Sequence, residues 1–121
     1  MNYLDYAATT PVNAEVLEVI TKEMASFGNP SSVYRIGREQ KQKIERVKKA
    51  ILSELQASPH DAIIFTSSGS EGNNLVFESI REHFAKEKGH IIVSAVEHPS
   101  VRKPAEFLEQ EGFEVTYLAP N

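Results

Sequence analysis

The sequence predicts an α/β fold in which an N-terminal helical arm precedes a βαβαβ unit with parallel strands. Before Pro59 the apolar residues recur at helical spacing, and after it short apolar runs alternate with helical stretches. The connections between the later elements are short, which favours parallel strands joined by right-handed crossovers. Strands that are apolar at successive positions suit a sheet covered on both faces.

The composition is that of an ordinary globular domain. Of the 121 residues, 40% are hydrophobic and 25% charged, with a net charge of −4, which excludes disordered and fibrous classes. The mild acidity argues against a general binder of nucleic-acid backbones. No apolar run approaches the ~20 residues of a membrane span. The first residues lack the basic and apolar regions of a secretion signal, so we expect a cytoplasmic protein.

Two helices are expected before Pro59. The first follows an irregular segment at 5–11, ends at Gly28-Asn29-Pro30, and has apolar residues three or four positions apart, at Val12, Val16, Ile20, Met24 and Phe27. The second ends at Ser58-Pro59 and carries an apolar face of Ile36, Ile44, Val47, Ile51 and Leu55. We divide the chain into 1–30, the N-terminal arm with the first helix, and 31–121.

Three strands and two helices are expected after Pro59. The strands lie at 62–65, 91–93 and 114–118, and the helices at about 70–88 and 100–110. We expect Ser70 and Ser100 to cap these helices. The chain stops directly after the last strand with no helix to cover it. We therefore expect these residues to be the front part of a larger protein.

The segment at 65–74, which connects the first expected strand to its helix, has the features of an anion site. It is rich in hydroxyl residues around Gly69, and free amides at a helix N-terminus attract anions. Open α/β sheets bind ligands at the carboxyl ends of their strands, where this segment lies. It lacks the motifs of nucleotide-binding loops, and Glu71 disfavours a polyphosphate, so a phosphate monoester suits it better. A turn that binds nothing is the alternative.

His98 follows the second expected strand and so belongs to the same edge of the sheet. Pro99 biases the backbone of His98 toward an extended conformation. A solvated or capping histidine is the alternative interpretation. The four histidines show no metal-ligand spacing and the chain has no cysteine, so no metal site is expected.

Four segments, in order along the chain, resemble the cysteine desulfurases of the class V aminotransferase family, which are fold-type-I pyridoxal-phosphate (PLP) enzymes. They are Tyr-Leu-Asp-Tyr-Ala-Ala-Thr-Thr-Pro at 3–11, Phe-Gly-Asn-Pro-Ser-Ser at 27–32, Ile-Phe-Thr-Ser-Ser-Gly-Ser-Glu-Gly-Asn-Asn-Leu at 64–75 and Val-Glu-His-Pro-Ser-Val at 96–101. The resemblance implies that 31–121 is the first part of a PLP-binding large domain. It also implies a parent enzyme that takes sulfur from L-cysteine, leaving L-alanine and an enzyme-bound persulfide.

The resemblance also implies site residues. Gly69 and Ser70 match the pair that holds the PLP phosphate, and His98 matches the histidine that stacks on the pyridine ring and helps move protons. Residues of the substrate pocket are implied by the first two segments, at Ala7, Thr9 and Asn29. The family usually has threonine at position 70, and either hydroxyl can donate. Gly72, where alanine is usual, and Ser68, where a small residue is usual, are mild departures that bear on cofactor affinity.

Other family residues lie beyond position 121: the Schiff-base lysine, the aspartate at the pyridine nitrogen, the substrate-binding arginine and the sulfur-accepting cysteine. None of the eight lysines here occupies a family lysine position. PLP acts through an imine with an amine, and sulfur transfer needs a thiolate, so we expect the 121 residues alone to be inert. The parent's implied partners are a second copy of itself and a sulfur acceptor or scaffold, for iron–sulfur clusters or thiolated tRNA.

Three alternatives stay open. Another enzyme of the family, a selenocysteine lyase or an aminotransferase, shares these segments. A non-catalytic remnant that folds only on docking to its missing part is the second. The third is nucleic-acid binding by 35–49, which carries seven basic and two acidic residues, although no aromatic residues alternate with them as a stacking platform requires.

Overall fold

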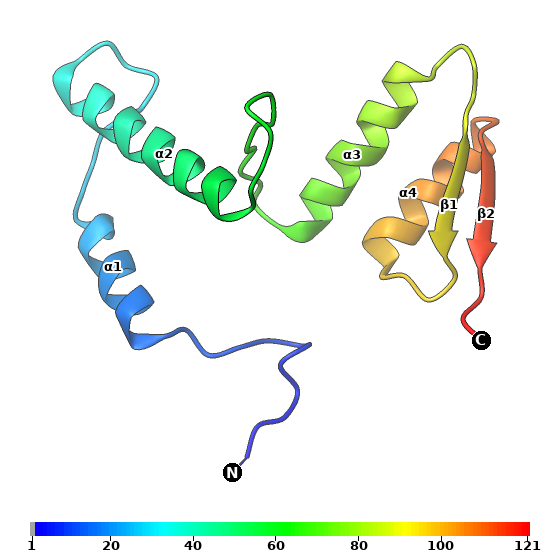
Figure 1. Ribbon diagram of the computed structural model, residues 1–121, viewed down its shortest axis with the longest axis horizontal. Helices are drawn as coiled ribbons and strands as arrows, with labels where there is room; N and C mark the ends of the chain where they lie inside the picture. The colour runs from blue at the N-terminus through cyan, green and yellow to red at the C-terminus, as the bar shows by residue number, and fades with distance from the viewer. Residues whose placement is uncertain (1) are drawn as a thin grey trace. The chain divides into compact units, whose positions relative to one another are not determined.

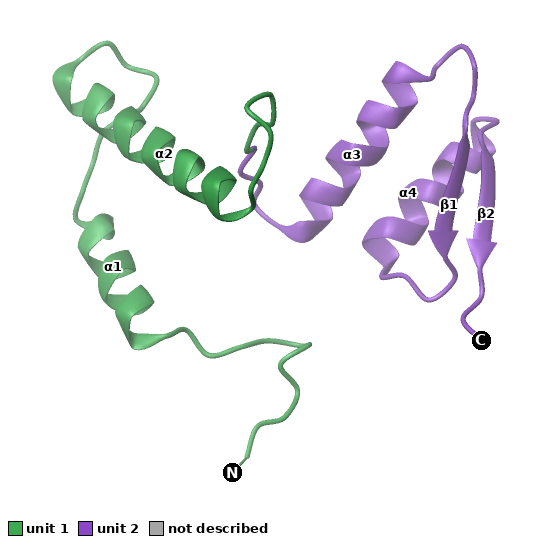
Figure 2. Cartoon of the chain, viewed as in Figure 1, with its two compact units in different colours: residues 1–63 green, residues 64–121 purple. Residues whose placement is uncertain are grey.

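The computed structural model describes residues 2–121 (Figure 1). Its elements are α1 (Ala14–Met24), α2 (Arg35–Glu54), α3 (Gly69–His83), β1 (His90–Ser94), α4 (Pro99–Gln110) and β2 (Glu114–Leu118). They form two compact units, residues 1–63 and 64–121 (Figure 2). The division at residue 30 that the resemblance implies stays a prediction.

The first unit contains the two expected helices. The carboxamide oxygen of Asn13 caps α1 by accepting the N–H of Glu15 at 2.8 Å. Polar contacts join the helices, since Lys43 Nζ on α2 lies 2.7 Å from Glu23 Oε2 on α1 and 3.1 Å from Ser26 Oγ. No residue of α1 is buried. Its apolar stripe therefore follows the expected period without being covered within this unit.

Gly37 explains how α2 meets the turn that precedes it. It is the buried residue of α2, and a Cβ built there would lie 2.1 Å from Ser32 Oγ and 2.3 Å from the carbonyl oxygen of Asn29. The turn itself is closed by the N–H of Ser32, which donates to the carbonyl of Asn29 at 3.0 Å. A residue without a side chain is required here because the turn lies directly against the helix.

The second unit contains a parallel two-stranded sheet. β1 pairs with β2 in a register that runs from His90↔Glu114 to Ser94↔Leu118, and α4 is the crossover between the strands. A small core of Phe77, Ala105, Leu108 and Phe113 joins α3, α4 and the turn before β2. This confirms the expected α/β class with parallel strands and short connections.

The strand expected at 62–65 is wrong for this structure. Residues 61–66 belong to no helix or strand, and the side chains of Ile64 and Phe65 are exposed. A strand is defined by its ladder of hydrogen bonds with a neighbour. An apolar run shows only that a segment is suited to burial, so one βαβ unit forms here instead of βαβαβ.

The expected helix caps are also wrong, because both helices begin earlier than expected. Ser68, not Ser70, caps α3, and its hydroxyl oxygen accepts the N–H of Glu71 at 3.2 Å. His98, not Ser100, caps α4, with Pro99 in the first helical position. Proline suits that position because its fixed φ matches the helix and its missing N–H has no partner there.

Two features are absent from residues 2–121, the part of the chain that the structure describes. Within them, none of the helices combines the length and the apolar character needed to cross a membrane. The same stretch of chain brings together no group of three histidine, cysteine, aspartate or glutamate side chains that could hold a metal ion.

Candidate functional site

The start of α3 carries unpartnered backbone donors. The N–H of Gly72 donates to the carbonyl of Ser68 at 3.1 Å, and the N–H of Glu71 donates to the Ser68 hydroxyl. In the part of the chain that the structure describes, the N–H groups of Gly69 and Ser70 have no hydrogen-bond partner. These are the donors that a helix leaves free at its first turn, where its dipole favours negative charge.

Glu71 holds the segment that precedes this helix in place through Ser67. Its Oε2 accepts the backbone N–H of Ser67 at 2.5 Å and the Ser67 hydroxyl at 2.7 Å. These two bonds, the hydroxyl first, hold the pKa of Glu71 below its ordinary value, so the carboxylate is charged at neutral pH. The bonds form on the Ser67 side of the turn, so they leave the donors of Gly69 and Ser70 free.

Steric space at the same place fits a ligand. A Cβ built on Gly69 would meet nothing within 4 Å, and one built on Gly72 would meet only Thr66 Oγ1, at an ordinary 3.5 Å. Alanine, which the family usually has at position 72, would therefore fit here without crowding. Two free amides, the Ser70 hydroxyl and open space suit the oxygens of a phosphate monoester such as that of PLP.

His98 is joined to α3 through two side chains. The Nδ2 of Asn73 donates to Ser100 Oγ at 2.9 Å, and Ser100 Oγ lies 2.8 Å from His98 Nδ1. The structure thus brings His98 together with the helix that starts at Gly69. Sequence reasoning missed Asn73, because its bond to Ser100 joins residues of two different helices.

The three expected substrate-pocket residues, Ala7, Thr9 and Asn29, lie in the other unit, residues 1–63. The N–H of Ala8, between the first two, donates to the Asp5 carbonyl at 3.1 Å, and Asn29 Oδ1 accepts the N–H of Ser31 at 2.9 Å. Both segments are therefore turns with defined local bonds. Their proximity to Gly69 and His98 stays a prediction.

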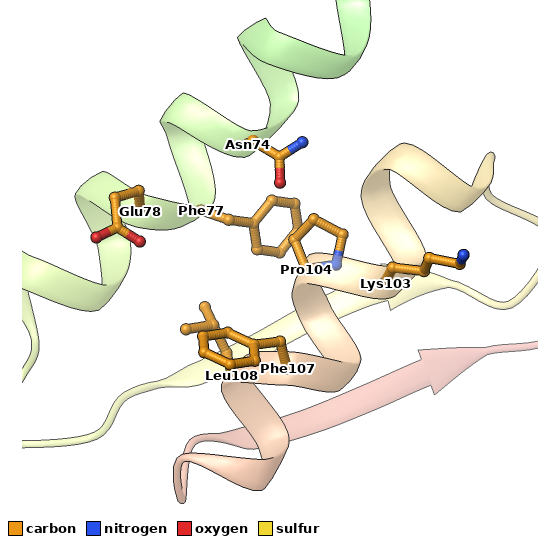
Figure 3. A pocket seen from close by; sticks show the side chains of 7 residues that line it. All are labelled: Asn74, Phe77, Glu78, Lys103, Pro104, Phe107 and Leu108. Carbon is orange, nitrogen blue, oxygen red and sulfur yellow. The ribbon is translucent and has the colours of Figure 1, made fainter.

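A separate hollow of about 380 Å³ lies between α3 and α4 (Figure 3). Phe77 from α3 and Pro104 from α4 both line it. The full lining is Asn74, Phe77, Glu78, Lys103, Pro104, Phe107 and Leu108. None of the expected site residues is among them, so the hollow is distinct from the donors at the start of α3.

Relatives of this chain cover it almost completely. A cysteine desulfurase IscS of Dictyoglomus turgidum is 45% identical over 117 residues, which are 96% of this chain and 29% of that protein. A selenocysteine lyase of Bos taurus is 39% identical over 96% of this chain and 31% of its own length. The chain therefore spans less than a third of the length of these curated relatives.

Solved structures agree with the fold. The structure described as "SspA in complex with cysteine" matches all of this chain with a TM-score of 0.87 and 39% identity, over 35% of its own length. One described as a NifS-like protein matches 94% of this chain with a TM-score of 0.85 and 33% identity, over 31% of its own length. The family model for aminotransferase class-V matches residues 2–121. The chain belongs to the class V aminotransferase family.

Proposed function

We propose that this chain is the N-terminal part of a PLP-dependent cysteine desulfurase. The observation that carries the proposal is the pair of free N–H groups at Gly69 and Ser70, on a helix bridged to His98 by Asn73 and Ser100. The names of relatives add support, since one is a cysteine desulfurase and one solved neighbour is described as a complex with cysteine.

Each site residue then has a distinct task. The amides of Gly69 and Ser70, the Ser70 hydroxyl and the α3 dipole would hold the phosphate group. His98, at the start of α4, would stack on the pyridine ring and hold or move a proton. PLP, when bound, supplies an electron sink that makes bonds at the substrate's α- and β-carbons easier to break.

The complete reaction needs groups that these 121 residues do not supply. It breaks the carbon–sulfur bond of L-cysteine, forms a sulfur–sulfur bond with an enzyme thiolate and leaves a proton on the carbon, so that L-alanine and a persulfide result. The sequence contains no cysteine. We therefore expect no sulfide release from L-cysteine by the purified 121-residue chain supplied with PLP, and release would refute this.

A selenocysteine lyase is the second candidate, favoured by the 39% identity to the bovine enzyme of that name. The two activities differ in whether sulfur or selenium leaves the substrate. Reading the gene past the codon for Asn121 would separate them from an aminotransferase. We expect a lysine that follows a histidine, and then a cysteine in a loop. A lysine without that cysteine would contradict a desulfurase.

The homodimer, the sulfur acceptor and the cytoplasmic location stay predictions.

The phosphate site can be tested in the chain itself. The probe is pyridoxine 5′-phosphate, which keeps the ring and phosphate of PLP but has no aldehyde to react with surface lysines. Its ³¹P resonance is followed as the chain is added. We expect Ser70→Ala to weaken binding by about tenfold, the effect of losing one hydrogen bond to a charged group.

Ser79→Ala is the matched control, because Ser79 lies on the same helix and its hydroxyl bonds the carbonyl of Leu75 at 2.8 Å. This variant should bind the probe as tightly as the unsubstituted 121-residue chain does. Equal weakening in both variants, or no binding by the unsubstituted chain, would overturn the assignment of the phosphate site.

A further inference from the structure

Three atoms around His98 determine where its proton lies. The backbone N–H of Ser100 donates to His98 Nδ1 at 3.1 Å, as the helix cap of α4. The hydroxyl oxygen of Ser100 lies 2.8 Å from the same nitrogen. Asn73 Nδ2, from α3, donates to that hydroxyl oxygen at 2.9 Å.

A backbone N–H can only donate, so Nδ1 of the neutral ring must be the acceptor and must carry no proton. The hydroxyl leads to the same result. Its oxygen accepts from the Asn73 amide, which leaves its one hydrogen to be donated to Nδ1. A neutral imidazole has one protonated nitrogen. The proton of neutral His98 therefore lies on Nε2.

We infer that Asn73 and Ser100 are positioning residues that hold neutral His98 as the Nε2–H tautomer. Nε2 of the neutral ring is then a hydrogen-bond donor, suited to an anionic oxygen or sulfur on a bound ligand. Nε2 can accept a proton only after the proton that it already carries has left. The meaning of this tautomer for catalysis rests on the proposed function, whereas the tautomer itself is a property of this chain alone.

The local backbone supports the same arrangement. His98 has φ −58° and ψ 147°, the extended conformation of a helix cap, and Pro99 disfavours the helical alternative. The cap bond then directs Nδ1 toward the start of α4. Asn73 reaches the same point from α3, and the two helices pack against each other around Phe77, Ala105 and Leu108.

The tautomer is measured directly by long-range ¹H–¹⁵N correlation of ¹⁵N-histidine-labelled chain, at a pH where the ring is neutral. The nitrogen without a proton resonates far downfield of the protonated one. We expect Nδ1 of His98 to be the downfield nitrogen. Ser100→Ala and Asn73→Ala should each lower the ratio of Nε2–H to Nδ1–H tautomer, Ser100→Ala by about fivefold, which is the effect of one neutral hydrogen bond.

Two variants serve as controls. Ser100→Thr keeps a hydroxyl and should keep the parent tautomer ratio. Asn74→Ala removes a neighbouring carboxamide that donates instead to the Ser70 carbonyl at 2.7 Å, and should also leave the ratio unchanged. The resonances of His90, whose Nε2 contacts Thr116 Oγ1 at 2.8 Å, report whether each variant keeps the fold of the second unit.

Protonated Nδ1 in the neutral ring of the unsubstituted chain would overturn the inference, as the Ser100 N–H could then not donate to Nδ1 and the Ser100 hydroxyl oxygen would have to accept from it. A ratio unchanged in Asn73→Ala, with the His90 resonances preserved, would remove Asn73 from the positioning role. The measurement needs no ligand. Its failure therefore differs from a failure of pyridoxine 5′-phosphate to bind, which would contradict the proposed function and leave the tautomer intact.

Discussion

The two units of the chain are stabilised in different ways. In residues 64–121, apolar side chains from two helices and the turn before β2 enclose a core, and Leu108 at its centre is 1% exposed. In residues 1–63 the helices carry equally regular apolar stripes, but α1 buries none of its residues. The contacts in that unit include the exposed ion pair of Lys43 with Glu23 and the close approach at Gly37.

This difference shows that helical periodicity and burial are separate properties. Periodicity is local, whereas burial requires a second surface. Helical stability in proteins comes mostly from the packing of an apolar face. We therefore expect the second unit to respond strongly to changes in its core, and the first to respond mainly to changes in its turns.

The largest effect is expected from Leu108→Ala. Removing a buried leucine leaves a cavity and costs about 2–5 kcal/mol of unfolding free energy. The same change at Leu17 on α1, which is 55% exposed, should cost less than about 1 kcal/mol. Urea unfolding of the 121-residue chain, with amide exchange read separately in each unit, measures both. Similar costs at the two leucines would contradict the comparison.

A smaller loss of unfolding free energy is expected from glycine substitutions. Here the first unit should lose more than the second. Gly37→Ala gains helix propensity of about 1 kcal/mol but places a Cβ 2.3 Å from a backbone oxygen. We expect a net loss of ~1–3 kcal/mol because the turn at 29–32 must move. Gly69→Ala meets nothing within 4 Å, so its effect should stay within about 0.5 kcal/mol. A stabilised Gly37→Ala variant would show that the turn yields without cost.

The sequence was sufficient for features that depend on local chemistry. Helical spacing located the four helices of the described residues, and short apolar runs located β1 and β2. The anion site in the loop before α3 stays a prediction, based on its hydroxyl residues and Gly69, and within residues 2–121 two N–H groups there have no hydrogen-bond partner. Each of these features is encoded within a few consecutive residues.

Features that depend on a distant partner could not be predicted. The run at 62–65 has the composition of a strand, but whether a ladder forms depends on a neighbouring strand. The link from Asn73 to Ser100 joins residues of different helices, and no local pattern marks Asn73 as the partner of Ser100. The caps at Ser68 and His98 were missed for a smaller reason. At each helix start two polar residues that lie two positions apart could cap, and bond geometry alone decides between them.

The smallest expected effect is a change in the pKa of two glutamates, Glu23 in residues 1–63 and Glu71 in residues 64–121. The hydrogen bond from Lys43 lowers the pKa of Glu23, and the bonds from neutral Ser67 lower the pKa of Glu71. A carboxyl whose pKa is lowered by folding stabilises the folded chain at pH values above its ordinary pKa. That contribution is lost as the pH falls through the lowered pKa. Side-chain ¹³C titration by NMR follows each carboxyl separately.

Salt should raise the pKa of Glu23 toward its ordinary value, because ions screen an exposed charge pair. The pKa of Glu71 should change little with salt, because its partners are uncharged, but Ser67→Ala should raise it by removing the hydroxyl donor. Ser53→Ala on α2 is the matched control and should alter neither carboxyl. A salt response at Glu71 equal to that at Glu23 would mean that long-range charge, and not the Ser67 bonds, holds this carboxylate at the start of α3.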